Sequence, residues 1–187
     1  MSIRKLFPSE ATALSDHLIR LTPDARSLRF MGGMHDVAVR EHCVRINWFR
    51  TVVMGYFDEG VLRGAAELHV ADKLRPDLCE SAITVEAAWQ NQGVGTELLR
   101  RILVIARNRS ARGVLINCFA DNYPIQHIAR KFGARIRSRA GESEAEIPTR
   151  APTYFSLYEE VVNDWCGWMS VVLTRFHAEY LVAPRLR

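Results

Sequence analysis

The sequence predicts a mixed α/β domain, in which a pair of strands is followed by strands that alternate with helices. Three observations support this fold class. Residues 50–57 and 61–70 are rich in β-branched and aromatic residues and flank Asp58-Glu59-Gly60, a combination typical of a β-hairpin. Residues 93–108 carry apolar side chains at the spacing of an amphipathic helix. Residues 114–119 then form an apolar run of strand length, as expected for a buried strand.

The other segments extend this alternation toward both ends of the chain. Residues 3–7 predict a short strand, and residues 8–21 predict a helix that begins at Pro8-Ser9-Glu10. Thr22-Pro23-Asp24 is interpreted as a turn. The further predicted elements are a helix at 37–48, a strand centred on 82–85, a helix at 124–132, a strand at 134–139 and a short strand at 144–147.

We divide the chain into a domain at residues 1–150 and a C-terminal helical extension at residues 151–187. Within the extension, a set of apolar residues follows helical spacing: Tyr154, Tyr158, Val161, Trp165, Trp168, Val172, Phe176 and Tyr180. Gly167 could mark a break between two helices. Because so aromatic a segment is rarely left in water, we expect it to pack on its own domain or at a homodimer interface. Its polar face is not a Lys/Arg face, so a membrane-surface role is not expected.

Composition indicates a soluble globular protein. The 187 residues are 48% hydrophobic and 25% charged, which excludes a disordered chain or a disulfide mini-scaffold. No signal-peptide run opens the chain, and no uncharged stretch is long enough to span a bilayer. The four cysteines show no C-x-x-C spacing, so we expect four reduced core thiols and a cytoplasmic location. His35 and His42 lack a third ligand, so no metal is expected.

Positive charge is concentrated in one part of the chain. The formal net charge is +4, but residues 100–139 hold ten Lys or Arg and one acid, for a local net charge of +9. These cations are not interleaved with aromatic residues as a nucleic-acid groove would require, so no nucleic-acid partner is expected. An anionic small ligand remains compatible with this distribution.

The segment from Gln90 to Thr96 lies between a predicted strand and the strongest predicted helix. Gly93 and Gly95 allow a tight turn in which successive N–H groups point into one concavity. The unpaired N–H groups and dipole of the helix would complete a site for a pyrophosphate. A dinucleotide fingerprint needs a third glycine where Leu98 stands, and a P-loop needs a lysine that is absent.

The string Q-x-x-G-x-G at Gln90 to Gly95 resembles the acetyl-CoA signature of the GNAT N-acetyltransferase superfamily. Trp89 stands where this family usually has an aromatic residue, and Asn122 begins a helix that ends at Lys131-Phe132-Gly133, like the family's ending. The resemblance covers roughly residues 3–138. It implies a mixed, mostly antiparallel central sheet splayed between two central strands, with helices on both faces, and an N-acetyltransferase that transfers an acetyl group to a primary amine by direct attack in a ternary complex.

The resemblance also implies where the cosubstrate acetyl-CoA binds. Its pyrophosphate would meet the backbone N–H groups of the signature loop, and its pantetheine arm would pair with the strand around Ile83. The Val85 N–H would polarise the thioester carbonyl. The implied cofactor-binding residues are Ile83, Val85, Gln90, Gln92, Gly93, Val94, Gly95, Thr96 and Asn122. We expect one or two arginines of residues 100–139 to meet the 3′-phosphate and the others to be solvated.

A general base is needed because free amines are mostly protonated at pH 7. Glu80, five residues before Val85, matches an acidic position of Pat-like domains and is our candidate; Glu67 is the alternative, and Glu86 is expected on a loop. Many family members have a tyrosine as general acid where this chain has Ala129. Tyr123 could replace it, or the acid is water.

A second resemblance concerns the acceptor side. His17-Leu18-Ile19-Arg20-Leu21-Thr22-Pro23, followed by Leu28-Arg29-Phe30, resembles the opening of the acetyltransferase domain in Pat-type bacterial protein-lysine acetyltransferases. The acceptor is therefore either a small-molecule amine or a protein lysine. The alternative to an enzyme is a non-catalytic acetyl-CoA-binding or regulatory module on the same fold, since the usual tyrosine is missing.

Overall fold

The computed structural model describes the backbone of residues 1–72 and 75–181 and the side chains of residues 1–70 and 77–169. Its centre is a seven-stranded sheet in the order β1-β2-β3-β4-β5-β7-β6. The strands are β1 (Ser2–Lys5), β2 (Thr51–Asp58), β3 (Val61–Asp72), β4 (Arg75–Val85), β5 (Gly113–Phe119), β6 (Arg135–Arg139) and β7 (Glu142–Pro148). Every neighbouring pair is antiparallel except β4 and β5, which are parallel. The mixed, mostly antiparallel sheet is therefore confirmed.

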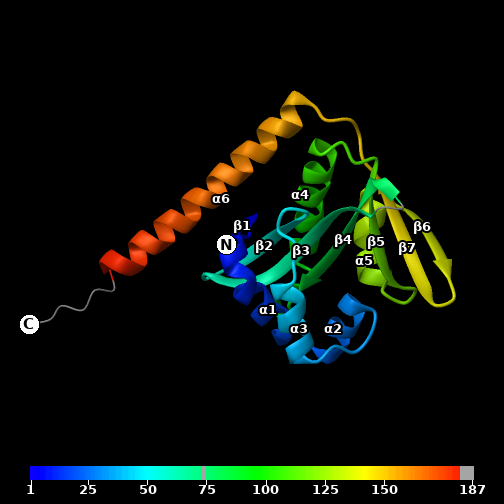
Figure 1. Cartoon of the computed structure of the whole chain (residues 1–187), viewed down its shortest axis with the longest axis horizontal. Coiled ribbons are helices and arrows are strands. Elements are labelled where there is room, and N and C mark those ends of the chain that lie inside the picture. The colour runs from blue at the N-terminus through cyan, green and yellow to red at the C-terminus, as the bar shows by residue number, and fades with distance from the viewer. Residues whose placement is uncertain (73–74, 182–187) are drawn as a thin grey trace, which may run out of the picture.

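Helices cover both faces of this sheet (Figure 1). The α-helices are α1 (Ala11–Arg20), α2 (Pro23–Phe30), α3 (Asp36–Val44), α4 (Val94–Asn108), α5 (Tyr123–Lys131) and α6 (Tyr154–Leu181). Short 3₁₀ turns at Pro8–Glu10 and Ala87–Trp89 precede α1 and α4. The first three helices lie on one face and α4 and α5 on the other, while α6 crosses outside α4 and β1 and extends past the sheet (Figure 1).

Each face of the sheet has its own apolar core. On one face, Leu98 and Ile102 of α4 are fully buried against Leu68 of β3. On the other face, Leu14 of α1 packs with Val53 of β2. Burying such side chains contributes about 1.5–3 kcal/mol each, which explains why the periodic apolar positions of α1 and α4 could be recognised from the sequence.

The β2–β3 hairpin turns at the predicted residues. Glu59 and Gly60 have φ angles of 49° and 78°, the two positive values that a two-residue hairpin turn of type I′ requires. Glycine satisfies this geometry without strain, and the register of the two strands follows from the turn. The prediction of a hairpin is confirmed.

Residues 22–30 differ from the prediction. The interpretation of Thr22-Pro23-Asp24 as a turn is wrong, because these residues begin α2. The Thr22 hydroxyl accepts a hydrogen bond from the Ala25 N–H at 3.2 Å, and Pro23 occupies the first helical turn. An N-terminal threonine cap and a proline at the first position are helix start signals as well as turn signals. The next helix is also shorter than expected, since α3 ends at Val44.

The C-terminal extension forms one continuous helix, so the suggested break at Gly167 is wrong. At this position α6 crosses the first strand closely: a Cβ added to Gly167 would lie 2.6 Å from the Cβ of Arg4. The glycine therefore serves close packing and not a turn. Thr153 and Ser156 cap the helix start by exchanging hydrogen bonds between backbone N–H groups and hydroxyls.

α6 packs on the domain through its polar side, and its aromatic side is exposed in the single chain. The Lys5 ammonium lies 2.6 Å from Glu160 and 2.7 Å from Asp164, and Asn108 donates to Glu160 at 2.7 Å. Cys166 of this helix is exposed, so the prediction of four core thiols is wrong for that residue. It is confirmed for Cys43, Cys79 and Cys118, which are buried.

Candidate functional site

A splay between β4 and β5 forms the centre of the site. The two strands pair only over Leu78–Glu80 against Gly113–Leu115, although both continue beyond these residues. The Glu86 N–H donates to the C=O of Arg63 on β3 at 2.9 Å. Because consecutive strand residues direct their backbone groups to opposite sides, the N–H groups of Ile83 and Val85 are directed toward β5. The splay therefore presents strand edges that another extended chain could pair with.

A cleft of about 310 Å³ runs through this splay. Its walls come from β4, β5, the signature loop, α2 and α5. The predicted cofactor residues that line it are Ile83, Val85, Gln90, Gly95 and Asn122. The other predicted cofactor residues, Gln92, Gly93, Val94 and Thr96, are not part of the cleft wall; Val94 is buried in the core against the sheet.

The signature loop is shaped by its glycines and its own amides. Gly93 has a φ of 82° and caps α4, a backbone conformation that glycine adopts without strain. The Gln90 side-chain amide donates to the Val85 C=O at 2.8 Å, which ties the loop to the end of β4. Gly95 faces α5, where an added Cβ would lie 3.2 Å from the Cδ1 of Ile128. Glycine is therefore favoured at position 93 by the backbone conformation and at position 95 by close packing against α5, which agrees with the predicted tight turn.

Glu80 lines a second, larger cavity of about 750 Å³. Its neighbour Cys79 lies in the core under α4, so the Glu80 side chain points to the opposite face, which carries α1, α2 and α3. Glu80 is exposed, and the Asn117 side-chain amide donates to it at 3.1 Å. Asn117 lines the cleft as well as the cavity, so the two hollows meet beside this carboxylate.

Glu67, the alternative base, lies in a different environment. Only 2% of it is exposed, and the Arg29 guanidinium lies 2.6 Å from its carboxylate. Burial alone would raise the pKa of Glu67, but Arg29 together with His42 and His69 holds it well below the usual range. The two imidazoles lie 3.5 Å and 3.4 Å from its second oxygen. Glu67 is therefore the partner of Arg29, which lines the cleft, and of His42 and His69, which line the larger cavity.

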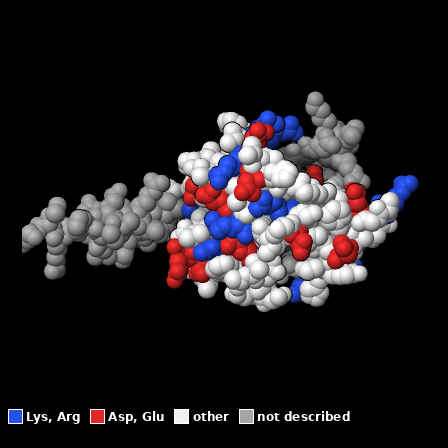
Figure 2. All heavy atoms as spheres, turned by 90° about the horizontal axis from the view of Figure 1, so that it is seen from below, with Lys and Arg blue, Asp and Glu red and all other residues white. Residues whose placement is uncertain are grey.

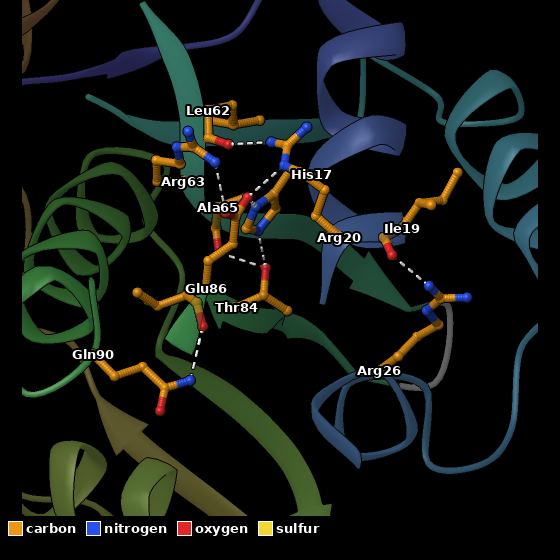
Figure 3. Close-up of polar contacts among 11 residues, drawn as sticks. His17, Ile19, Arg20, Arg26, Leu62, Arg63, Ala65, Thr84, Glu86 and Gln90 are labelled. Carbon is orange, nitrogen blue, oxygen red and sulfur yellow. Dashed lines mark hydrogen bonds and ion pairs between the residues drawn. The ribbon is translucent and has the colours of Figure 1, made fainter. Parts of the chain in front are cut away.

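A buried polar cluster holds the end of β4 (Figure 3). His17 of α1 is fully buried, with Nδ1 3.1 Å from Glu86 and Nε2 2.9 Å from the Thr84 hydroxyl. Arg20 and Arg63 donate to the same Glu86 carboxylate at 2.9 Å and 3.0 Å. These contacts come from α1 and β3 and meet on either side of Val85, so they fix the strand segment that borders the cleft.

Glu86 lies directly after the end of β4, outside the strands as predicted, but it is buried there. It is 8% exposed and caps the 3₁₀ turn that leads into the signature loop. Burial opposes its ionisation, but hydrogen bonds from His17, Arg63 and Arg20 lower the pKa of Glu86 to about 2. Burial also lowers the pKa of His17, which favours a neutral imidazole. No short-range sequence pattern indicated this cluster, because its partners are up to 69 residues apart.

Most arginines of the basic stretch are exposed, as predicted: Arg109, Arg112, Arg130, Arg135, Arg137 and Arg139. Arg100, Arg101 and Arg107 are partly buried. Arg100 pairs with Glu97 and with Glu159 of α6. Arg101 also pairs with Glu97 and donates to the Ile3 C=O at 2.9 Å. Three further arginines of β6 lie in register with acids of β7: Arg135 with Glu146, Arg137 with Glu144 and Arg139 with Glu142. Much of the local charge of +9 is therefore matched by acids from elsewhere in the fold.

Charges of both signs are interspersed on the face seen from below in Figure 2, and they form no continuous basic stripe there.

The candidate general acids lie away from the cleft. Tyr123 is 69% exposed and is not part of the cleft wall. Ala129, at the usual tyrosine position, is fully buried in the core between α4 and α5. Within the described residues, no group of His, Cys, Asp and Glu is arranged to hold a metal ion. No helix in that part of the chain combines the length and apolarity needed to cross a bilayer.

Residues 18–134 match the family model described as the Acetyltransferase (GNAT) family. The chain belongs to this family. Membership implies acetyl-CoA-dependent acetyl transfer, and it agrees with a splayed sheet whose signature loop precedes α4.

Solved structures with the same fold include three bacterial proteins at low sequence identity. The GNAT domain of S. lividans PAT has a TM-score of 0.68 and 17% identity, covering 78% of this chain and 89% of that one. Ribosomal-protein-alanine N-acetyltransferase from Brucella melitensis has a TM-score of 0.62 and 16% identity, covering 78% and 97%. YncA from Salmonella typhimurium, whose structure contains its cofactor acetyl-CoA, has a TM-score of 0.62 and 14% identity, covering 82% and 98%.

Proposed function

We propose that this GNAT family member transfers the acetyl group of acetyl-CoA to a primary amine, with Glu80 as the general base. The observation that carries the proposal is the position of Glu80: an exposed carboxylate at the junction of the splayed cleft and the large cavity, oriented by Asn117. The cleft suits the cosubstrate, and the cavity suits the acceptor.

The residues of the cleft fit the pantetheine arm and the pyrophosphate. The backbone groups of Ile83 and Val85 directed toward β5 can pair with an extended amide-bearing chain, as an added strand does. The N-terminus of α4, opened by Gly93, presents unpaired N–H groups that favour an anion. Gln90 holds the loop to Val85, and Asn122 stands at the opposite wall.

The acceptor would occupy the cavity of about 750 Å³ on the face that carries the first three helices. Bound acetyl-CoA supplies an activated acyl thioester. The amine nitrogen attacks the carbonyl carbon, the C–N bond forms, the C–S bond breaks, and the sulfur leaves with the bonding electron pair. Glu80 accepts the proton that the amine must lose. The Val85 N–H donates to the carbonyl oxygen as negative charge develops there.

Glu80 is preferred to Glu67 because the two carboxylates differ in access and in pairing. Glu67 is enclosed and already paired with Arg29, so protonating it would break a buried ion pair. Glu80 faces the cavity and accepts a neutral amide hydrogen bond. Among the residues whose side chains are described, Glu80 has no ion-pair partner, and an accessible carboxylate of this kind can take up a proton at lower cost.

The test is CoA release over a panel of small amines and lysine peptides, with Glu80→Gln compared with the native chain. We expect kcat to fall about 10²-fold, because a general base contributes roughly that much. The deficit should shrink as the pH rises, since more of the amine is then already neutral. Glu144→Gln is a matched control, because it removes another carboxylate that lines the same cavity, on β7 opposite Asn117. Equal kcat in Glu80→Gln and the native chain would exclude Glu80 as the base.

The alternative, a non-catalytic acetyl-CoA-binding module, draws support from the buried Ala129 and from Tyr123 lying off the cleft. The two functions separate in one experiment. Calorimetric binding of acetyl-CoA together with no CoA release from any amine of the panel would favour the module. Turnover with any amine would favour the enzyme, with water protonating the leaving thiolate.

A further inference from the structure

The outward face of α6 is apolar, although the helix is bound to its own domain. Large side chains on this face are exposed to the following extents: Tyr154 92%, Phe155 85%, Tyr158 70%, Val161 65%, Trp165 64% and Trp168 53%. Soluble proteins rarely leave so many neighbouring apolar groups in water, and such a face marks an interaction surface. We propose that the outward face of α6 pairs with the same helix of a second copy of this chain.

The spacing of these residues points to a helix as the occupant. Tyr154, Tyr158, Val161, Trp165 and Trp168 are separated by alternating steps of four and three residues. This is the heptad pattern of the seam between two paired helices. Phe155, Leu157 and Val162 flank the seam and are also exposed, so the apolar stripe is wider than a minimal two-residue seam.

Between Tyr154 and Trp168, the opposite side of the helix already contacts the domain, so the seam faces away from the domain. Glu159 pairs with Arg100, Glu160 with Lys5, and Gly167 packs against Arg4. These residues lie between the seam positions and face the domain. The domain therefore holds α6 by its polar side and presents the seam in a fixed orientation, which reduces the entropy lost on association.

The exposed area is sufficient for a stable dimer. An aromatic side chain offers about 150–250 Å², and five of them on this face are more than half exposed, giving about 700 Å² per copy. A standard interface buries about 800 Å² per partner. A second copy supplies an equal seam through a two-fold axis, so both seams are covered by one contact.

A lipid surface fits less well. Helices that lie on membranes carry Lys or Arg along the polar face, where they meet anionic headgroups. The polar residues of α6 between Tyr154 and Trp168 include the acids Glu159, Glu160 and Asp164 and no Lys or Arg. These acids face the domain and are engaged by its cations. Nothing on this part of the helix would attract an anionic membrane.

The test is the mass of the full chain in solution, under reducing conditions because Cys166 is exposed. Sedimentation equilibrium should give twice the chain mass of 21.3 kDa. Val161→Lys places a charge in the middle of the seam and should raise the dimer dissociation constant at least about 100-fold. Cys166→Lys adds the same charge at an exposed position outside the seam and should leave the dimer intact.

Far-UV circular dichroism and acetyl-CoA binding confirm that each variant is folded, since neither residue lies at the cleft. A native chain that stays monomeric up to about 100 μM would overturn the proposal, as would a dimer unaffected by Val161→Lys. Sedimentation of a monomeric native chain with phosphatidylcholine vesicles, abolished by the same variant, would also overturn it and identify a lipid surface as the occupant.

Discussion

Replacing Glu86 with glutamine removes one charge from the cluster that holds the end of β4, while keeping the side chain's shape and one acceptor oxygen. The pKa of Glu86 is about 2 in the fold and 4.5 as the ordinary value. This difference corresponds to at most about 3 kcal/mol of stabilisation at neutral pH. Arg20 and Arg63 are 37% and 25% exposed, so solvent screens part of the attraction. We therefore expect Glu86→Gln to lower the free energy of unfolding by about 2 kcal/mol.

The pH dependence distinguishes a charge effect from a packing effect. Because the folded pKa of Glu86 lies below its unfolded value, the stabilisation is complete above about pH 4.5 and is lost as the pH falls toward 2. The gap between the native chain and Glu86→Gln should therefore narrow as the pH falls below 4.5, by at most about 1.4 kcal/mol per pH unit. His17, whose pKa is lowered by burial, adds a separate loss as the pH falls below 6.5, and that loss should be larger in Glu86→Gln because Glu86 raises the pKa of His17.

Urea unfolding at pH 7, 4.5 and 3.5 measures these free energies. Glu59→Gln is the matched control, because Glu59 is exposed in the hairpin turn and should change stability by less than about 0.5 kcal/mol. A loss for Glu86→Gln that is no greater than the control, or a gap that stays constant down to pH 3.5, would refute the electrostatic account of the cluster. Acetyl-CoA binding should weaken alongside stability, since Val85 lies between Thr84 and Glu86.

The glycines support further predictions. Gly95→Ala should weaken acetyl-CoA binding, measured by calorimetry, more than it lowers stability, because the added methyl lies 3.2 Å from Ile128 at the cleft wall. Gly93→Ala meets no neighbouring atom but must hold a φ of 82°, so it should cost about 1 kcal/mol in urea unfolding. Gly167→Ala should lift α6 from β1, because its Cβ would lie 2.6 Å from Arg4; faster hydrogen exchange in Ser2–Lys5 would reveal this, and unchanged exchange would contradict it.

Prediction from the sequence succeeded where the physics is local. The hairpin at Glu59-Gly60 follows from residues that tolerate positive φ, and α4 follows from its apolar spacing and from Gly93 as its cap. The strand order could be inferred only through the resemblance to a known family. α2 was missed because Thr22 and Pro23 are equally good signals for a turn and for a helix start, and the choice depends on what residues 25–30 pack against.

The chemistry of the two candidate bases shows where sequence reasoning stops. Glu67 and Glu80 stand on neighbouring strands of the same sheet and point to the same face. In the sequence they differ little. In the fold, α2 and α3 place Arg29 and His42 against Glu67, which becomes a buried ion partner, while Glu80 remains open to the cavity. Helix packing between distant segments therefore separates their roles.

By itself, the sequence determined most of the elements and the glycine turn before α4, because φ preferences and apolar periodicity act between residues a few positions apart. Only the tertiary structure decided which carboxylates are paired and which side of α6 faces the domain. The partners of Glu86 lie up to 69 residues away, and α6 is held by Lys5 from the other end of the chain. Such contacts depend on the whole packing arrangement, in which a polar face of a helix can be the buried one when cations from another segment meet it.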